Sequence, residues 1–147
     1  MAYTAKIAGL DQVLRNIERY SKELADGIDK EISTGAKNIA VSAALKAPKG
    51  KSGELGGSIS VLNPVKYSYA VSVSAPYAPF VEFGTGLRVF KTPEFNFTPE
   101  IRAYARQFFV SGKGRLYPTP FLFPAYEYEK LQIVKRVKAI LFKDKKV

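Results

Sequence analysis

One long stripe of apolar residues constrains the fold of this chain more than any other feature of the sequence. Between Leu10 and Ala44, apolar residues recur every three or four positions, and charged residues occupy the other faces. This spacing matches the 3.6-residue period of an α-helix that buries one side. The stripe is Leu10, Val13 or Leu14, Ile17, Leu24, Ile28, Ile32, Ala36, Ile39 and Ala43. We therefore predict one long amphipathic helix that ends at Ala47, Pro48 and Gly50.

Two glycines interrupt the predicted helix. Glycine lowers the stability of a helix interior, so Gly27 and Gly35 mark either a bend or a close packing contact. The second half of the helix is rich in alanine, at Ala40, Ala43 and Ala44. Because these side chains are small, we expect a sheet to pack close against them.

Two patterns of period two follow the helix. Residues 49–57 are rich in glycine and lysine, and we expect them to form an exposed, flexible connection. Apolar residues then alternate with serines over residues 59–61, and Asn63 and Pro64 break the pattern. Over residues 65–73, large apolar side chains alternate without error with polar or small ones. This period is typical of half-buried strands, so we predict an antiparallel hairpin with one solvated face.

Two more helices are predicted beyond the hairpin. Pro76 would open a short helix that runs to Phe83, and Gly84 would close it in the left-handed conformation. A last amphipathic helix begins at Ala125, and the tail from Lys143 is expected to fray. The apolar positions of that helix are Leu131, Val134, Val137, Ile140 and Leu141.

A long aromatic-rich insertion separates these two helices. Residues 87–117 show no regular period except one helical signal, in which Thr98 caps and Pro99 opens a helix. A loop this long in a compact domain is normally functional or disordered, and its aromatic residues argue against disorder. These residues are Phe90, Phe95, Phe97, Tyr104, Phe108 and Phe109.

Composition favours one folded domain over residues 1–147 and disfavours an enzyme. Hydrophobic residues make up 46% and charged residues 24% of the chain, an ordinary globular balance. The sequence has no cysteine and no histidine, which excludes disulfides and cysteine-ligated zinc and removes the commonest general base near neutral pH. It also lacks a run of about 18 apolar residues and a signal peptide, so we expect no membrane contact and folding in the cytosol.

No motif predicts catalysis or a bound cofactor. The glycines near Gly84 and in residues 49–57 lack the spacing of a phosphate-binding loop. The acidic residues Glu54, Glu82, Glu94 and Glu100 are isolated from one another in the sequence. We therefore predict no catalytic residue, no cofactor and no metal site.

The chain is strongly basic, with a net charge of +10. Such an excess commonly marks contact with polyanions or acidic protein surfaces. Basic residues gather near the end of the chain, and the simplest interpretation is a solvated helix face and tail. They are Lys130, Lys135, Arg136, Lys138, Lys143, Lys145 and Lys146.

Two motifs, taken in order, are more specific. The segment YAPFVEFGTG spans Tyr77 to Gly86, and PTPFLFPA follows at Pro118 to Ala125. Together they resemble the paired motifs of the tail-component or neck proteins of long-tailed bacteriophages, also called tail-completion proteins. The segment APKGKSGELGGSI at Ala47 to Ile59 is similar to the passage from first helix to first strand in that family. The insertion at 87–117 departs from the family's shorter pattern and leaves its own role undecided.

The residues and the resemblance together predict a fold and a function. The predicted elements give an α+β domain in which a long N-terminal helix and a C-terminal helix pack on a small, mainly antiparallel sheet. The resemblance implies a structural virion protein of the head–tail junction that forms a ring, six-fold, on the tail tube. Its expected partners are other copies of itself, a head-closure or connector protein, and a tail terminator or tail tube protein. Duplex DNA would pass through the ring without sequence-specific binding, and assembly would take place in the host cytoplasm.

We expect the aromatic and proline-framed segments to form the assembly interface. Glu82 would be either an exposed helix residue or the partner of an Arg or Lys in the same or a neighbouring subunit. Pro120 and Pro124 would hold their segment extended, with Phe121 and Phe123 on one face. The predicted interface residues are Tyr77, Phe80, Glu82, Phe83, Gly84, Thr85, Phe90, Phe95, Phe97, Phe108, Phe121 and Phe123.

Three alternative functions remain open at this point. Basic and aromatic residues alternate in the insertion, a composition shared by single-strand nucleic-acid sites and by protein interfaces. A basic nucleic-acid-binding protein is therefore one alternative. A tail-terminator ring protein is a second, and a small nuclease or cell-wall hydrolase is a third.

Overall fold

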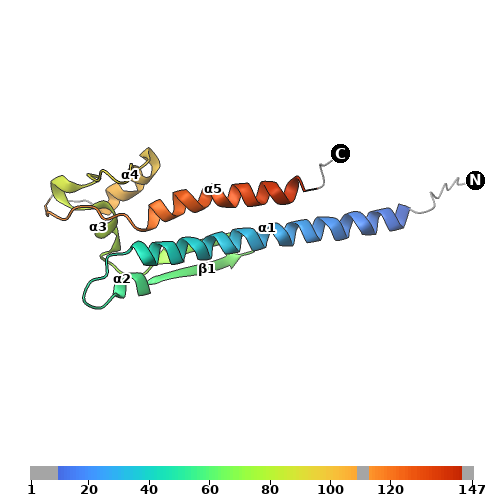
Figure 1. Ribbon diagram of the computed structural model, residues 1–147, viewed down its shortest axis with the longest axis horizontal. Coiled ribbons are helices and arrows are strands. Elements are labelled where there is room, and N and C mark those ends of the chain that lie inside the picture. The colour runs from blue at the N-terminus through green and yellow to red at the C-terminus, as the bar shows by residue number, and fades with distance from the viewer. Residues whose placement is uncertain (1–9, 109–112, 144–147) are drawn as a thin grey trace, which may run out of the picture.

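Two antiparallel helices give the molecule its elongated shape (Figure 1). The computed structural model describes residues 10–108 and 113–143. Helix α1 spans Leu10–Lys46, helix α5 spans Leu122–Leu141, and the two pack against each other. A two-stranded sheet packs on another side of α1, so that α1 lies between the sheet and α5. The predicted α+β fold is confirmed. The prediction that both helices pack on the sheet holds for α1, whereas α5 packs mainly on α1.

The predicted long helix is confirmed as α1, which has 37 residues. It ends one residue before Ala47, whose N–H donates to the carbonyl of Ala43 at 2.8 Å. Pro48 follows and cannot continue the helix. Ala36, Ile39 and Ala43 are buried as the stripe predicts. Four predicted stripe residues have side chains outside the described part of the chain: Leu10, Val13, Leu14 and Ile17.

Both glycines of α1 lie against α5. A Cβ atom at Gly27 would be 3.8 Å from Cδ1 of Ile140, an ordinary van der Waals distance. A Cβ atom at Gly35 would overlap the side chain of Ile133. Of the two interpretations of these glycines, the structure supports close packing.

Alanine at these two positions is expected to change stability in opposite directions. Gly27→Ala gains helix propensity without a clash, so the free energy of unfolding should rise by about 0.5–1 kcal/mol. Gly35→Ala gains the same propensity but overpacks Ile133, which typically costs about 1–3 kcal/mol, so its free energy of unfolding should fall. Urea denaturation of both variants measures the two signs. A stabilised Gly35→Ala variant would contradict this packing.

The predicted antiparallel hairpin is confirmed. Strand β1 spans Ile59–Val65 and strand β2 spans Ser68–Val73, with Val61 opposite Val71. The pairing of the strands is interrupted at Asn63 and Pro64, where the sequence predicted a break, but β1 continues through them to Val65. The second strand begins at Ser68 and not at Val65 as predicted.

Strand β1 continues past Pro64 because the N–H that proline lacks would fall at an irregularity in the strand pairing. The register shifts at a β-bulge before Val65, a position where proline is tolerated. The Asn63 side-chain amide donates to the carbonyls of Val65 and Ser68, at 3.0 and 3.2 Å. Through these two bonds Asn63 links the ends of the two strands beside the turn at residues 66–67.

The tip of the hairpin is anchored to α1. The Lys66 Nζ atom lies 2.6 Å from Oδ1 of Asp26. The Tyr67 N–H and the Tyr69 hydroxyl donate to the two carboxylate oxygens of Asp29, at 2.8 and 3.1 Å. The hairpin therefore lies beside the part of α1 that begins at Asp26.

The glycine-rich connection contains a helical turn that the sequence did not predict. Helix α2 spans Glu54–Gly57, and Leu55 within it is buried. Leu55 packs into the same core as Ile39 and Ala43 of α1. The prediction of an exposed, flexible connection is therefore wrong for the second half of residues 49–57, because one leucine among the glycines ties that half to the core.

Helix α3 spans Ala78–Phe83, close to the prediction. Pro79 rather than Pro76 occupies its first turn. Gly84 ends it with φ 79° and ψ −177°. The positive φ agrees with the prediction, but the ψ angle makes Gly84 extended rather than left-handed helical.

The described residues in and next to the insertion form three short helical elements. They are η1 (Gly86–Arg88), α4 (Pro99–Ala105) and η2 (Arg106–Phe108). The cap predicted at Thr98 is confirmed, because its hydroxyl accepts the N–H of Ile101 at 3.4 Å. Phe109 of the predicted aromatic set lies outside the described residues.

Helix α5 begins at Leu122, three residues before the predicted start at Ala125. Pro124 lies in its first turn, where proline costs no hydrogen bond. The fraying expected at the end of the chain concerns mainly residues 144–147, which lie outside the described residues.

Two hydrophobic cores lie on either side of α3. The first joins α1, the hairpin and the start of α5; its buried members are Ile39, Ala43, Ala47, Leu55, Ala78, Phe121 and Ala125. The second belongs mainly to the insertion; its buried members are Phe83, Phe97, Ile101 and Ala105. The insertion thus folds around aromatic residues of its own.

Candidate functional site

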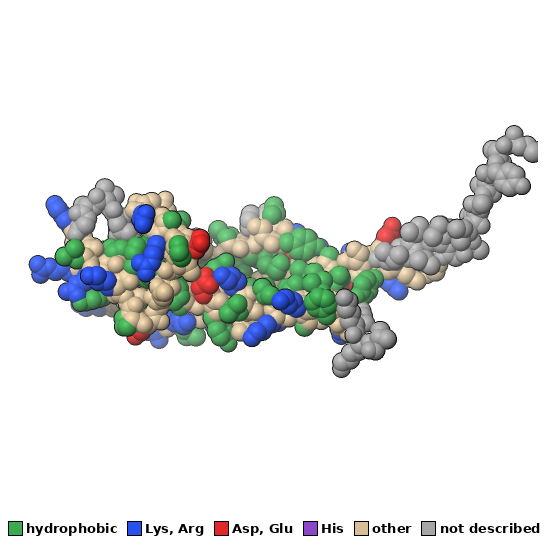
Figure 2. Space-filling model, turned by 90° about the horizontal axis from the view of Figure 1, so that it is seen from above, with side chains coloured by type: hydrophobic (Ala, Val, Ile, Leu, Met, Phe, Trp, Pro, Cys, Tyr) green, Lys and Arg blue, Asp and Glu red, His purple; other side chains and the backbone are tan. Residues whose placement is uncertain are grey.

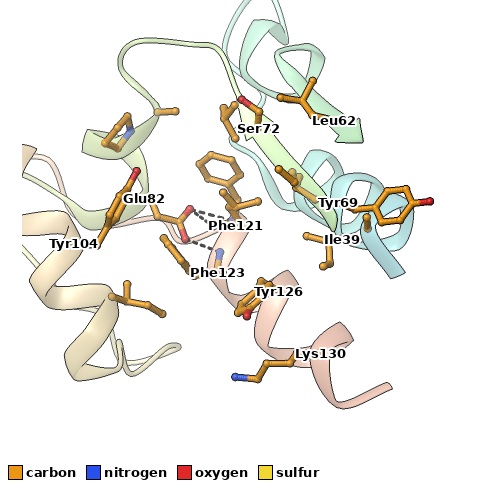
Figure 3. Close-up of a pocket in the computed structure, with 18 of the residues that line it drawn as sticks. Ile39, Leu62, Tyr69, Ser72, Glu82, Tyr104, Phe121, Phe123, Tyr126 and Lys130 are labelled. Atoms are coloured by element: carbon orange, nitrogen blue, oxygen red, sulfur yellow. Dashed lines mark hydrogen bonds between the residues drawn. The ribbon is translucent and has the colours of Figure 1, made fainter. Parts of the chain in front are cut away.

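The two motifs singled out in the sequence meet at the side chain of Glu82. Its carboxylate accepts three backbone N–H groups at the start of α5 (Figure 3). The donors are Phe121 at 2.9 Å, Leu122 at 3.0 Å and Phe123 at 2.9 Å. The first N–H groups of a helix have no partner within the helix, and they form its positive end. Glu82 therefore acts as the N-terminal cap of α5, from 39 or more residues away in sequence.

Glu82 is one of the most buried charged groups in the described part of the chain, with 3% of its surface exposed. Both sequence interpretations, an exposed residue or the partner of an Arg or Lys, are wrong, because backbone N–H groups take the place of a cation. Burial raises the pKa of Glu82 above its ordinary value, and the three N–H groups partly offset that rise. The cap also explains why α5 starts ahead of Pro124.

Backbone pairing extends the junction between the two motifs. The Thr85 N–H donates to the carbonyl of Leu116, and the Leu116 N–H donates to the Thr85 hydroxyl, both at 2.9 Å. The Thr119 N–H donates to the carbonyl of Val81 at 2.8 Å. The hydroxyl of Thr85 thus bonds a residue that lies 31 positions away in the sequence. The base of the insertion is therefore closed by the motifs on either side of it.

Several predicted interface aromatics fill the insertion's own core. The Phe83 ring lies 5.4 Å from the Phe97 ring and 5.6 Å from the Phe123 ring, between centroids. Phe95 meets Phe97 edge to face at 4.9 Å. Phe83 and Phe97 are 2% exposed and Phe121 is 1% exposed, so these three offer almost no surface to a partner. Phe90, Phe95, Phe108 and Phe123 are partly buried around the same core.

Phe121 and Phe123 do not point to one face, as the sequence predicted. Phe121 belongs to the first core and Phe123 packs on the second. The segment is helical from Leu122 onward, which rotates successive side chains by about 100° instead of alternating them. Tyr77 and Phe80, by contrast, are 42% and 37% exposed.

An open apolar groove of about 990 Å³ follows α1 between β2 and α5 (Figure 3). Three large side chains of its lining are strongly exposed: Tyr104 at 56%, Leu62 at 51% and Val134 at 46%. Its charged lining residues are Glu82, Glu100 and Lys130. The lining also includes Ile32 and Ile39 of α1, Tyr69 and Val71 of β2, and Tyr126 and Ile133 of α5.

Apolar side chains are conspicuous over the middle of the molecule, and cations gather at the end formed by the insertion (Figure 2). The Arg88 guanidinium lies 4.0 Å from the centre of the Tyr117 ring. The Arg102 guanidinium lies 5.0 Å from the centre of the Phe90 ring, and its Nε donates to the carbonyl of Phe97. The other cations of the insertion are Lys91, Arg106, Lys113 and Arg115.

The basic face of α5 is partly neutralised within the chain. Arg136 bridges α5 and α1, with its Nε 2.7 Å from Glu31 and a terminal nitrogen 2.6 Å from Glu129. Asn38 also donates to Glu129 at 3.1 Å. The interpretation of this region as a simply solvated charge run is therefore wrong for Arg136, which holds the two helices together.

Within residues 10–108 and 113–143, no group of three or more acidic side chains could hold a metal ion. The same residues contain no helix with the length and apolar character needed to cross a bilayer.

A large exposed apolar groove on a helical scaffold is typical of proteins that bind other proteins. Residues 11–84 match the model of the family described as "Bacteriophage HK97-gp10, putative tail-component". Because the match covers half of the chain, from α1 through α3, the chain belongs to this family of bacteriophage tail components. No match was found among curated proteins or among solved structures. The family inferred from the sequence motifs is thereby confirmed.

Proposed function

We propose that this chain is a structural protein of the phage head–tail junction that forms a ring on the tail tube and joins the tail to the head connector. Membership of a tail-component family supports a role in the tail. The ring, its six-fold symmetry and its place at the junction are inferences from the resemblance of the two motifs to tail-completion proteins.

The observation that carries the assembly role is the open apolar groove beside α1. Its volume is about 990 Å³, and its lining includes several exposed aromatic and aliphatic side chains. Exposure of such a surface in water is unfavourable by about 25 cal/mol per Å² of apolar area, so covering it with protein would favour assembly. Copies joined head to tail through unlike surfaces form a closed ring when the rotation between neighbouring copies divides a full turn evenly.

The expected partners are a head-closure or connector protein on one side of the ring and a tail terminator or tail tube protein on the other. Duplex DNA would pass through the opening without sequence-specific contacts, and no reaction would be catalysed. A strongly basic lumen would bind DNA phosphates and retard passage, so we expect the lysines in the C-terminal part of the chain to lie largely away from the channel wall.

Electron cryomicroscopy of the intact particle tests this proposal. The expected result is density for this chain in a ring between capsid and tail tube. If the density lies instead at the position of a tail terminator, the chain is a tail-terminator ring protein and the proposed place in the neck is wrong. A particle in which the chain is absent from the tail would overturn the proposal.

A second candidate, a basic nucleic-acid-binding protein, is favoured by the cations at the insertion end. Fluorescence anisotropy with duplex and single-stranded DNA distinguishes the two. Non-specific binding at physiological salt typically has a Kd of about 10⁻⁴–10⁻⁶ M and weakens steeply as salt rises. We expect the purified chain to bind no more tightly than this. A much tighter Kd would favour the nucleic-acid-binding function.

A further inference from the structure

The insertion forms the end of the molecule that lies opposite the first turns of α1 (Figure 1). Residues 87–117 carry six cations and two acidic residues, so the net charge of this segment is +4. Cations are conspicuous on this end in the space-filling view (Figure 2). The family match ends at Gly84, so the family does not explain this charged surface.

Two segments of the insertion meet at this end, and together they form a surface that we call the tip. The Thr85 N–H donates to the carbonyl of Leu116 at 2.9 Å, which joins the two segments at their base. The Arg88 guanidinium lies 4.0 Å from the centre of the Tyr117 ring, which joins them a second time. The Lys91 N–H donates to the carbonyl of Arg88 at 3.0 Å and closes the turn between these two cations. The members of the tip are Leu87, Arg88, Lys91, Arg115, Leu116 and Tyr117.

Three large apolar side chains of the tip are exposed. Leu87 is 82% exposed, more than any other large apolar side chain that the structure describes. Tyr117 is 54% exposed and Leu116 is 47% exposed. Single exposed apolar residues are common on protein surfaces, but several of them beside arginines resemble the centre of an interface, where aromatic residues and Arg are enriched. The tip is therefore a candidate interaction surface.

The positive charge of the tip is not neutralised within the described part of the chain. The ion pairs found there involve the cations Lys66, Lys130 and Arg136, none of which belongs to the tip. Of the two acidic residues of the insertion, Glu100 interacts with Lys130 at the edge of the groove. A surface with unpaired cations attracts a surface of opposite charge. Charge complementarity therefore points to an acidic partner.

A protein fits this surface better than a nucleic acid does. Burial of Leu87 and Leu116 is favourable against apolar side chains, which a phosphate backbone does not provide. Proteins that bind single strands stack bases on open aromatic rings, but Arg88 covers one face of the Tyr117 ring. A second copy of the chain fits poorly as well, because it would bring a net charge of +10 of its own.

The contacts within the tip also prepare it to bind. A guanidinium can bind a carboxylate through two parallel hydrogen bonds, a geometry that depends on the position of its plane. Arg88 is already held against Tyr117, so it loses less side-chain entropy when it binds. The two bonds between Thr85 and Leu116 fix the backbone on which these side chains stand.

We propose that the tip docks on an acidic surface of a different virion protein. The partner's carboxylates pair with Arg88, Lys91 and Arg115, and its apolar side chains cover Leu87 and Leu116. This inference rests on the proposed function and gives the chemistry of one neighbour at the head–tail junction. It also assigns the insertion a role that the sequence left undecided, the recognition of that neighbour.

Photo-crosslinking at the centre of the tip identifies the surface that covers it. A photo-reactive benzophenone amino acid replaces Leu87 in the full chain, where the side chain is largely exposed, and particles that contain this chain are irradiated. We expect mass spectrometry to find the cross-link in another virion protein, within a segment that has more Asp and Glu than Lys and Arg. A cross-link to DNA, to a second copy of this chain, or to a neutral or basic segment would overturn the inference, as would the absence of any cross-link.

Charge reversal measures how much the tip contributes. Particles assembled without this chain are mixed with purified chain, and the chain concentration that gives half of the maximal yield of infectious particles is determined. Arg88→Glu combined with Arg115→Glu is expected to raise this concentration on the order of 30-fold. The matched control combines Lys135→Glu with Lys138→Glu, two exposed residues of α5, and changes the net charge equally. The control should raise the concentration by less than about threefold. Equal effects of the two double variants would overturn the inference.

Two substitutions at Leu87 test the sign of the partner's charge. Leu87→Lys and Leu87→Asp both remove the apolar contact, but only the aspartate adds a charge that an acidic surface repels. We expect the aspartate variant to require about tenfold more chain than the lysine variant in the same assay. Equal requirements would show that the partner surface is not acidic. Because Leu87 is exposed and lies outside both cores, the two variants should unfold at the temperature of the parent chain.

Failure of this inference and failure of the proposed function are distinguishable. If the parent chain completes particles and the tip variants complete them equally well, the tip is not a docking surface and the proposed function stands. If the parent chain neither completes particles nor is found in them, the proposed function fails, and this inference with it. If the tip double variant loses about tenfold or more in affinity for DNA relative to the α5 control, measured by fluorescence anisotropy, the tip is a nucleic-acid surface and the inference is overturned.

Discussion

Glu82→Ala is expected to lower the free energy of unfolding by about 3–5 kcal/mol, the usual cost of removing one partner from a buried charged interaction. The substitution leaves the N–H groups of Phe121, Leu122 and Phe123 without their acceptor. Each buried donor without a partner costs about 1–3 kcal/mol. Total stabilities of single domains are about 5–15 kcal/mol, so the loss is a large fraction of the whole. Guanidinium denaturation followed by circular dichroism measures it.

Glu127→Ala is the matched control for that experiment. Glu127 lies on the same helix that Glu82 caps, and it forms an exposed pair with Lys130 at 2.9 Å. Exposed pairs contribute about 0–1 kcal/mol, so this variant should be close to the parent chain. Equal effects of the two substitutions would contradict the capping role of Glu82.

Glu82→Gln separates the shape of the side chain from its charge. Its amide oxygen can accept N–H groups as the carboxylate does, but its NH₂ group would face a donor, so we expect a loss of about 1–3 kcal/mol. The pH dependence has a definite sign. Because the pKa of Glu82 is raised in the folded chain, protonation favours folding. The stabilisation that the protonated Glu82 side chain provides is complete below the pKa that this group has in the unfolded chain. It decreases as the pH rises through the higher pKa of the folded chain. The stability difference between the parent chain and Glu82→Gln should therefore be larger in acid than at neutral pH.

Local patterns were sufficient to predict the longer elements of the fold. The stripe from Leu10 to Ala44 predicted α1, and the alternation over 65–73 predicted strand β2, because burial of one face repeats with the period of the backbone. The cap at Thr98 was predicted because its acceptor and donor are three residues apart. In each case the physical cause lies within a few residues of its effect.

The errors at the candidate site have causes that no local sequence pattern shows. Glu82 was assigned to solvent or to a cation because its three donors lie 39 to 41 residues away. Phe83 and Phe97 were assigned to an interface because composition does not distinguish an aromatic core from an aromatic surface. The one local signal that pointed inward was the position of Glu82 itself, a lone charge in the apolar run APFVEF. A lone charge in such a run has to be either solvated or satisfied by buried hydrogen bonds.

The exposed surfaces, in contrast, could not be predicted from periodicity. The groove is lined by residues from α1, both strands, α3, α4 and α5, and no single segment of the sequence shows it. Two contacts support the wall that α5 contributes: the Glu82 cap holds the start of α5, and Gly35 lets α5 approach α1. The capping interaction and the candidate interface are therefore linked, since loss of the cap would disturb the wall that α5 contributes.

Gly84→Val is expected to be, with Glu82→Ala, one of the two most destabilising substitutions, with a loss of about 2–6 kcal/mol in the free energy of unfolding. Gly84 has φ 79° and ψ −177°, a conformation that is essentially restricted to glycine and costs other residues about 1–3 kcal/mol. A Cβ atom there would lie 2.8 Å from Cδ of Pro118 and 2.9 Å from the carbonyl oxygen of Leu116. Overpacking of this kind adds about 1–3 kcal/mol.

The position of the damage is as informative as its size. Gly84 adjoins Thr85, whose two bonds to Leu116 close the base of the insertion. Hydrogen exchange should therefore increase first at the amides of residues 85–90 and 116–119, while the amides of α1 near Ile39 stay protected until the chain unfolds globally. Gly57→Ala is the control, because a Cβ atom at Gly57 meets no atom within 4 Å. If Gly84→Val left exchange at Thr85 and Leu116 unchanged, the junction between the two motifs would not be the element that holds the insertion in place.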